Sequence, residues 1–446
     1  MRFRILISAL LLTKVLSISG AVLAIRQATV FDSEAKRLVP DQTILICDER
    51  ILAVGPTREI GIPSKAHVIE ARGRYVIPGL IDAHTHVVTV LYWAQITGDE
   101  LLPYYLAQGV TTIRNTGDAI AASRLVQRYA VEHPAISPRV FLASPLIDGD
   151  PPIHRDIGWP FSSPEQVPSF VEDMQKWGIT TLKIYARCPP EVAHKVIEEG
   201  HRRGLVVTAH LGRYSVDDAI ADGIDCLEHI ESVSDFLRTD PHDRHSLDLT
   251  TERARSLVET LARRKIFVDP TLMVFWGTLF FADVPEIIQD ADNAYVPRRL
   301  QEFWAKDRKT RLDNYSAGPL ERRRATFRKY QELVGMLHRA GVPLLVGTDA
   351  PEPQVPPGYS LHHEMELLVE SGLPPADVLA AATLQNARVL KQDTDLGTVA
   401  AGKRADLLIL NGNPLENIRN SRKIYRVIKG GRLLDPTVIL QSAPND

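Results

Sequence analysis

Eight short runs rich in β-branched residues alternate with longer stretches of helical period between Val76 and Ala350, and this alternation constrains the fold. The runs are VIPGLIDAH, VTTIRNTG, VFLASPL, TTLKIYA, LVVTAH, CLEHI, KIFVDPTL and PLLVGTDA. Several follow a helix-ending glycine, as in LAQGVTT and HRRGLVV, which suits a parallel sheet. Eight β-then-α units predict an α/β fold with a (β/α)8 TIM barrel. A doubly wound open sheet is the alternative, but it usually has fewer strands and a glycine-rich phosphate turn.

The two ends of the chain have a different pattern from the barrel region. Residues 22–75 read as short alternating strands with turns, and residues 396–446 return to this pattern. Because a closed barrel places its termini close together, we expect both ends to form one small β-sandwich domain beside a barrel of residues 76–395. Two long insertions follow predicted strands, at 147–164 and 277–324. Such insertions lie at the functional face of a barrel, and the second either covers the site or only thickens the wall.

The composition is that of a globular protein. The chain has 446 residues, 44% hydrophobic and 24% charged residues, and a formal net charge of −3. This charge gives no basic field for nucleic acid, so we expect a small-molecule substrate and no nucleic-acid partner. The three cysteines are too few and too scattered to form a disulfide framework.

The N-terminus has the layout of a secretory signal peptide. Residues 1–21 contain a basic tip, MRFR, followed by an apolar stretch and small residues at its end. Lys14 interrupts the apolar stretch, and the alternatives are an uncleaved membrane anchor and a cytosolic protein with an apolar first strand. We therefore expect an exported protein, periplasmic or secreted, which is attached to a membrane only if this segment stays uncleaved.

Six residues that could bind or bridge metal ions fall at the same end of the predicted strands. They are His84, His86, Lys183, His210, His229 and Asp349, from five strands. Each alone has an ordinary explanation, as a core histidine, a solvated lysine or a turn residue. In a barrel, however, these strand ends meet at one mouth. Four neutral imidazoles and a carboxylate together favour Zn²⁺ or a similar divalent ion.

Lys183 cannot bind a metal ion as an ammonium group, because both are cations. A lysine among metal ligands would be repelled unless it is neutralised. Reaction of its amine with CO₂ would give a carbamate, whose two oxygens can bridge two ions. We therefore expect CO₂ to be present as a lysine carbamate on Lys183.

Motifs along most of the chain resemble those of the amidohydrolase superfamily, and more closely its imidazolonepropionase-like and prolidase-like branch. They are PGLIDAHTHV, GVTTIRNTG, LKIYA, VVTAHLG, CLEHIE, LLVGTDAP, AATLQNARVL and LGTVAAGKRADLLILNGNPL, within about residues 24–436. The resemblance implies a binuclear centre with two divalent ions. The His84 and His86 pair with Asp349 would hold one ion, and the two remaining histidines the other, with carboxylated Lys183 between them.

Such a centre is expected to hydrolyse an amide, cyclic amide or ester, with a peptide or an N-acyl amino acid as the type of substrate. Two cations lower the pKa of a shared water, so that hydroxide forms near neutral pH. Asp349 is the expected general base, which would pass the proton to the leaving group. One departure puts a dipeptide substrate in doubt: the dipeptidases compared have a longer, tyrosine-bearing insertion where this chain has only ARCPPEVAHKVIEEGHRRG.

Residues near the predicted mouth could contact the substrate. The candidates are Tyr185, His154, Arg213 and His363, with Arg114, Arg187 and His362 as further possibilities. Tyr185 lies two residues beyond the predicted bridging lysine, on the same face of the strand, where its hydroxyl could bond an oxyanion. We also expect the protein to be a homo-oligomer.

Two other functions remain open at this point. One is a mononuclear deaminase or decarboxylase on the same barrel, for which a bridging Lys183 would be unnecessary. The other is a non-catalytic scaffold, which would be expected to have lost several of the six ligands. Metal content together with a screen for hydrolase activity would separate these functions.

Overall fold

The computed structural model describes residues 22–282, 296–314 and 318–443. The predicted signal peptide, residues 1–21, lies outside this part of the chain. The α/β fold and the parallel barrel are confirmed, since seven strands pair in the order β13-β12-β11-β10-β8-β7-β6. These strands are β6 (Leu80–Thr85), β7 (Val110–Asn115), β8 (Arg139–Gly149), β10 (Thr181–Ile184), β11 (Val206–Ala209), β12 (Cys226–Glu228) and β13 (Phe267–Asp269).

The eighth predicted run, residues 343–350, closes the barrel without forming a regular strand. It is bridged to β13 at Leu344 and to β6 at Ala350. Between these bridges, the carboxylate of Asp82 accepts hydrogen bonds from the backbone N–H and the hydroxyl group of Thr348, at 3.2 and 2.7 Å. A side chain thus replaces part of the backbone ladder, and we name residues 343–350 the closing segment.

Gly347 occupies a place in the closing segment where a larger residue does not fit. A Cβ atom there would lie 2.2 Å from Oδ2 of Asp269 and 2.7 Å from Cβ of His84. We expect Gly347→Ala to lower the free energy of unfolding by about 2–3 kcal/mol in urea denaturation, because the barrel must open to admit the methyl group. Gly61→Ala is the control. Apart from its chain neighbours, no atom of the described residues lies within 4 Å of a Cβ atom added at Gly61. Equal stability of Gly347→Ala and Gly61→Ala would contradict the expected clash.

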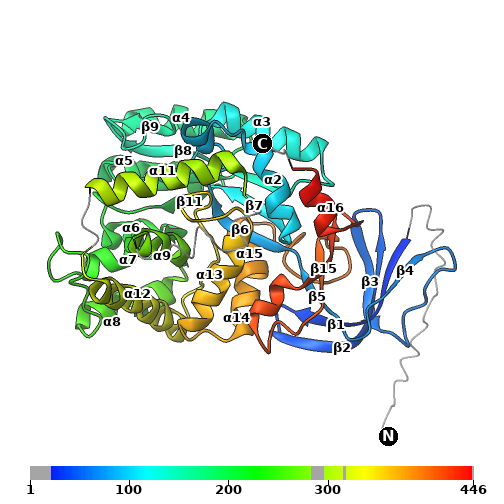
Figure 1. The fold of residues 1–446 in the computed structure, drawn as a ribbon. Helices are drawn as coiled ribbons and strands as arrows, with labels where there is room; N and C mark the ends of the chain where they lie inside the picture. The colour runs from blue at the N-terminus through cyan, green and yellow to red at the C-terminus, as the bar shows by residue number, and fades with distance from the viewer. Residues whose placement is uncertain (1–21, 283–295, 315–317, 444–446) are drawn as a thin grey trace, which may run out of the picture.

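Helices surround the barrel (Figure 1). They are α1 (Val90–Ala94), α2 (Gly98–Ala107), α3 (Ile120–Glu132), α4 (Val167–Lys176), α5 (Pro190–Arg202), α6 (Val216–Asp222), α7 (Glu231–Ser234), α8 (Glu252–Arg264), α9 (Leu272–Phe280), α11 (Arg298–Asn314), α12 (Leu320–Ala340), α13 (Tyr359–Glu370), α14 (Pro375–Ala380), α15 (Asn386–Val389) and α16 (Pro436–Gln441). Helix α5 shows why they pack: its buried Val192, Val196 and Ile197 recur at helical spacing and share a core with Leu182 of β10. The sequence pattern of apolar residues therefore holds each helix against the sheet.

Strands from both ends of the chain form a second sheet beside the barrel, as Figure 1 shows. They are β1 (Val22–Asp32), β2 (Arg37–Cys47), β3 (Arg50–Pro56), β4 (His67–Glu70), β5 (Tyr75–Pro78), β14 (Leu407–Leu410), β15 (Ile424–Lys429) and β16 (Arg432–Leu434). The strands predicted to form a sandwich hydrogen-bond into one continuous eight-stranded sheet, with a core that contains Ile25, Ile44 and Leu407. The division of the chain into domains of residues 22–75 with 396–446 and of residues 76–395 stays a prediction.

The first predicted run, VIPGLIDAH, is divided between the two sheets. β5 pairs with β1 and β14 of the terminal sheet, whereas β6 begins the barrel. Gly79 separates the two strands, and a Cβ atom at this position would lie 2.2 Å from Oγ1 of Thr111. The chain passes from one sheet to the other where only glycine fits against β7.

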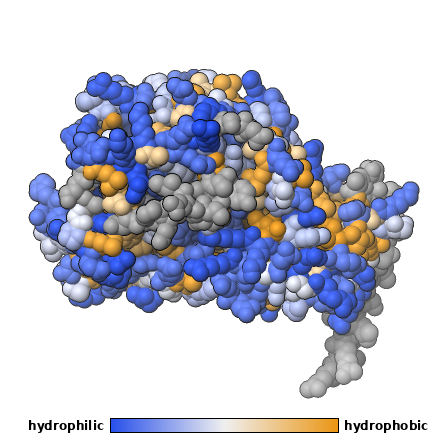
Figure 2. All heavy atoms as spheres, viewed as in Figure 1, coloured by the Kyte–Doolittle hydropathy of each residue, from blue (hydrophilic) through white to orange (hydrophobic). Residues whose placement is uncertain are grey.

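The face of the molecule seen in Figure 2 carries mostly hydrophilic side chains, with apolar ones in small separate groups. Among the described helices, none has the length and apolar character that a membrane crossing requires. The apolar residues are instead concentrated in the cores of the barrel and of the terminal sheet.

Candidate metal centre

The side chains predicted to bind metal converge at the carboxyl ends of the barrel strands. His84 lies in β6 and Lys183 in β10, while His210 and His229 directly follow β11 and β12. The closing segment contributes Asp349. A cavity of about 260 Å³ is lined by five of the six predicted residues, namely His86, Lys183, His210, His229 and Asp349. His84 lies beneath them and is fully buried.

The distances bring three of these side chains, those of His84, His229 and Asp349, within reach of a shared ion. Oδ1 of Asp349 lies 3.3 Å from Nε2 of His84 and 3.2 Å from Nε2 of His86. The ligand atoms of His84, His229 and Asp349 all lie within 4.8 Å of one another. The ring of His210 adjoins that of His229, with centroids 4.5 Å apart. The rings of His84 and His229 lie 4.6 Å apart, so the two ligand groups that the family resemblance assigns to separate ions are adjacent.

Three imidazoles of the cluster are neutral near pH 7. Burial and the nearby Lys183 lower the pKa of His84 to about 4 and that of His210 to about 3. Burial and the adjacent His210 lower the pKa of His229 well below its ordinary value. Because the neutral imidazole is the form that binds metal, the protein holds these side chains in a state ready for ligation.

Asp349 is kept ionised by its neighbours. Burial alone would raise the pKa of its carboxyl, but the imidazoles of His229 and His84 lower it well below the ordinary value. Burial would also lower the pKa of His86, yet the hydrogen bond to Asp349 raises it. The backbone at Asp349 and at His229 has φ values of 65° and 66°, which are uncommon outside glycine. The two strand ends thus carry local strain of a kind that is common at functional sites.

Lys183 is 1% exposed, and its Nζ makes no hydrogen bond to any residue of the described chain. Burial is the largest effect on its pKa, which is lowered from the ordinary lysine value. A buried amine without a partner is unfavourable, so this side chain fits a site in which another group completes its surroundings. The buried His84 Nε2 and His210 Nδ1 also have no hydrogen-bond partner among the described residues, which fits the same conclusion.

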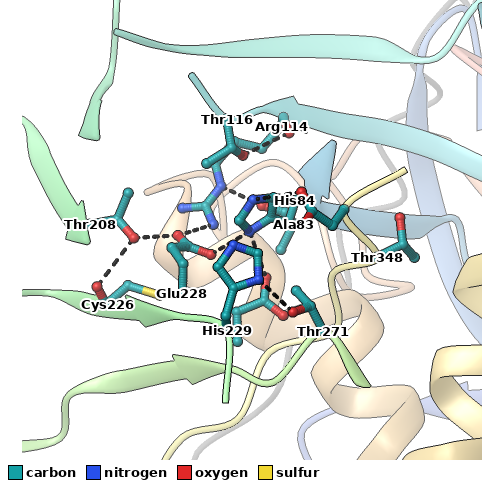
Figure 3. Close-up of polar contacts among 12 residues, drawn as sticks. Ala83, His84, Arg114, Thr116, Thr208, Cys226, Glu228, His229, Thr271 and Thr348 are labelled. Atoms are coloured by element: carbon teal, nitrogen blue, oxygen red, sulfur yellow. Dashed lines mark hydrogen bonds and ion pairs between the residues drawn. The ribbon is translucent and has the colours of Figure 1, made fainter. Parts of the chain in front are cut away.

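A polar network below the histidines connects several barrel strands (Figure 3). Oε2 of Glu228 lies 2.8 Å from Nδ1 of His84, and Nη2 of Arg114 donates to Oε1 of Glu228 at 2.6 Å. Thr208 also donates to Oε1 of Glu228, and Thr271 lies 2.7 Å from Nδ1 of His229. Burial would raise the pKa of Glu228, but Arg114 and other cationic neighbours lower it well below the ordinary value. The network therefore contains an ionised carboxylate.

The network contains residues that sequence reasoning missed or misplaced. The expected rim position of Arg114 is wrong, since its side chain is fully buried inside the barrel. Glu228 was not predicted as part of the site, and neither was Asp269, whose Oδ2 lies 4.0 Å from Nδ1 of His84. Alternation along the strand could have found Arg114, because it shares a strand face with the buried Thr112.

The candidate substrate residues fall into two groups. Tyr185 and His154 line the cavity, with the Tyr185 hydroxyl 3.1 Å from Nε2 of His154. Arg213 lines a separate hollow together with Arg187. The ring of His363 packs on that of Trp276, with centroids 5.0 Å apart, and is not part of the described cavity lining. The further candidate His362 is buried and bonds to Ser421 and the backbone of Gln108, so its contacts are structural.

Apolar side chains and two glutamates complete the cavity wall. They are those of Trp93, Leu146, Ile157, Val274 and Phe275, with Glu231 and Glu352. Burial and the charge of Asp349 raise the pKa of Glu352 to about 8. Helix α11 packs beside this wall, since Phe303 stacks on Trp93 with ring centroids 5.8 Å apart. Helix α11 belongs to the second long insertion, residues 277–324. This insertion therefore covers part of the site, which is one of the two roles predicted for it.

Comparisons with known proteins relate this architecture to established enzymes. Imidazolonepropionase of Geobacillus kaustophilus is 24% identical over 445 residues, which cover 89% of this chain and 91% of that protein. The structure of bottromycin amidohydrolase has a TM-score of 0.73 and 22% identity, and covers 95% of this chain and 91% of its own. A Xaa-Pro dipeptidase with bound methionine has a TM-score of 0.69 and 19% identity, and covers 93% and 99%. The likeness to these two structures shows the fold.

Curated adenine deaminases match over a short region only. The one from Paracoccus denitrificans is 32% identical over 101 residues, and the chain spans 16% of its length. The profile of the amidohydrolase family, in contrast, matches residues 75–434. This match includes the whole barrel and all six predicted ligands, and the chain therefore belongs to the amidohydrolase family.

Proposed function

We propose that the protein is a metal-dependent hydrolase that cleaves an amide, cyclic amide or ester bond in a small molecule. The observation that carries this proposal is the meeting of neutral histidines, the ionised Asp349 and the unpartnered amine of Lys183 around one cavity. These donors suit Zn²⁺ or a similar divalent ion. His84, His86 and Asp349 would hold one ion, and His210 and His229 a second.

The bound ions would supply an activated water and polarise the scissile carbonyl. Asp349 would then take the proton from the attacking water and deliver it to the leaving amine or alkoxide. Its position supports this role, because its carboxylate lies 3.3 and 3.2 Å from Nε2 of His84 and His86 and lines the cavity. Burial limits competing water around the carboxylate, which strengthens its interaction with the substrate.

Lys183 would bridge the two ions as a carbamate. A neutral amine is the form that adds to CO₂: a nitrogen–carbon bond forms, one carbon–oxygen π bond of CO₂ breaks, and one proton passes from the nitrogen to water. The lowered pKa and the absence of a hydrogen-bond partner among described residues both favour this reaction at Lys183. The carbamate would also supply the negative charge that the buried cations require.

The cavity wall favours a substrate with an apolar substituent. Five of the lining side chains are apolar, namely those of Trp93, Leu146, Ile157, Val274 and Phe275. No arginine lines the described part of the wall, so a free carboxylate would find no guanidinium partner there. Among peptide-like and N-acyl amino acid-like substrates, we expect those with a blocked carboxylate to be hydrolysed better.

Tyr185 is proposed to donate a hydrogen bond to the developing oxyanion, with His154 as its partner on the other side. Tyr185→Phe is expected to lower kcat by about 10²-fold with little change in KM, because the donor acts mainly in the transition state. Steady-state kinetics with the preferred amide would measure this. Tyr214→Phe is the matched control, since the Tyr214 hydroxyl bonds to Asp222 outside the described cavity lining. Equal kcat values for the two variants would remove Tyr185 from the mechanism.

A mononuclear deaminase is a second candidate. The local matches to adenine deaminases favour it, as does the group of His84, His229 and Asp349, which could hold a single ion. Elemental analysis would distinguish the two functions, because the binuclear hydrolase requires two ions per chain.

The proposal is tested with full-length protein supplied with zinc and bicarbonate. A substrate library of blocked peptides, N-acyl amino acids, cyclic amides, lactones and aminopurines should reveal hydrolysis of carbon–nitrogen or ester bonds. A chelator should abolish turnover, and added Zn²⁺ should restore it. A protein that binds no stoichiometric metal and hydrolyses none of these compounds would overturn the proposal.

A further inference from the structure

Glu228 is placed to determine which nitrogen of His84 carries the ring proton. Its Oε2 lies 2.8 Å from Nδ1 of His84, and both side chains are fully buried. The Glu228 carboxylate forms a fully buried ion pair with the guanidinium of Arg114 at 2.6 Å, and a carboxylate in such a pair accepts hydrogen bonds. Nδ1 of His84 must therefore carry a proton, whereas Nε2, 3.3 Å from Oδ1 of Asp349, forms no hydrogen bond to any described residue and can keep its lone pair.

Arg114 in turn determines which oxygen of the Glu228 carboxylate is available to His84. Its Nη2 donates to Oε1 of Glu228 at 2.6 Å, and its Nε donates to the backbone oxygen of Ala83, next to His84. Figure 3 shows this arrangement, with dashed lines from the Glu228 carboxylate to Arg114 and to His84. Because a guanidinium group cannot accept a hydrogen bond, Oε1 must be an acceptor. Only Oε2 remains for the imidazole.

We propose that the buried Arg114–Glu228 pair is a positioning device that keeps His84 in the Nδ1–H tautomer, with Nε2 ready to bind a metal ion. Glu228 and Arg114 touch neither substrate nor metal in this scheme, and they act through His84. The inference rests on the proposed metal centre and adds to it residues from β7 and β12. A carboxylate behind a ligating histidine typically changes metal affinity by about 10–100-fold.

The proposal predicts an unusual result for Glu228→Gln. Its carbonyl oxygen must face Arg114, which only donates, so its NH₂ group faces Nδ1 of His84. The imidazole must then accept at Nδ1 and carry its proton on Nε2, where it blocks ligation. We expect Zn²⁺ affinity, measured in competition with a chromophoric chelator, to fall by about 10–100-fold.

Removing Arg114 as well should rescue the binding of zinc. In Arg114→Met/Glu228→Gln the glutamine can rotate, so that its oxygen accepts from Nδ1 of His84 and its NH₂ group faces Thr208. The Thr208 hydroxyl can accept this bond, because its own proton has the backbone oxygen of Cys226 as an alternative acceptor at 3.2 Å. We expect the double variant to bind Zn²⁺ within about 3-fold of the wild type, although both changes disturb the core.

A spectroscopic measurement on the metal-free wild type tests the tautomer directly. Long-range ¹H–¹⁵N correlation spectra of protein labelled at histidine should show a protonated Nδ1 and an unprotonated Nε2 for His84, and the reverse for Glu228→Gln. A protonated Nε2 in the wild type, or a double variant that binds zinc no better than Glu228→Gln, would overturn the inference. If the wild type itself binds no metal, the proposed function fails instead, and the tautomer can still be read from the spectra.

Discussion

Asp349→Asn is expected to lower kcat for amide hydrolysis by about 10³-fold while the protein keeps most of its metal. The asparagine amide has the same shape and an oxygen that can remain near the ions, but it cannot accept a proton from water. Neighbouring histidines keep the pKa of Asp349 low, so the wild-type carboxylate is ionised and ready to accept this proton. Turnover and metal content of the same preparation should be measured together.

Asp349→Ala separates catalysis from metal binding. It removes both the base and the ligand oxygen, so it should lose metal as well as activity. If Asp349→Asn keeps the wild-type kcat, Asp349 is not the general base. If both variants lose metal equally, the loss of activity of Asp349→Asn no longer reports on proton transfer.

Lys183→Met should lower kcat by at least about 10³-fold, which corresponds to about 4 kcal/mol of transition-state stabilisation. Methionine has a similar length and suits the buried position, but it cannot form a carbamate. The metal content should fall below two ions per chain, and bicarbonate should no longer improve reconstitution. The melting temperature of the metal-free variant should not decrease, because the substitution removes a buried amine that has no hydrogen-bond partner in the described chain.

Lys195→Met is the matched control, since Lys195 lies on α5 and pairs with Glu198 at the surface. It should retain metal, activity and the response to bicarbonate. A Lys183→Met protein with two ions per chain and wild-type kcat would show that no carbamate is needed. A wild-type protein that reconstitutes equally well in CO₂-free buffer would lead to the same conclusion.

The regular parts of the barrel were predictable because their signals are local. Short β-branched runs after helix-ending glycines are strands in the structure, as in β10 and β11. The predicted strands were wrong in detail where long-range contacts determine the backbone structure. The closing segment is irregular because Asp82 bonds to Thr348, and the first run is divided at Gly79 because it serves two sheets.

The order of residues along the chain was sufficient to place histidines and Asp349 at strand ends, because parallel strands of a barrel share one mouth. It could not show that Arg114 points into the barrel toward Glu228, since a side chain acquires its partner only when strands distant in sequence become neighbours. Nor could it show that apolar side chains form part of the cavity wall or that its described part lacks arginine, because loops and helices from separate regions build that wall. Local periodicity thus determined the elements and the ligand types, whereas burial and long-range pairing decided the charge states and the surroundings of the site.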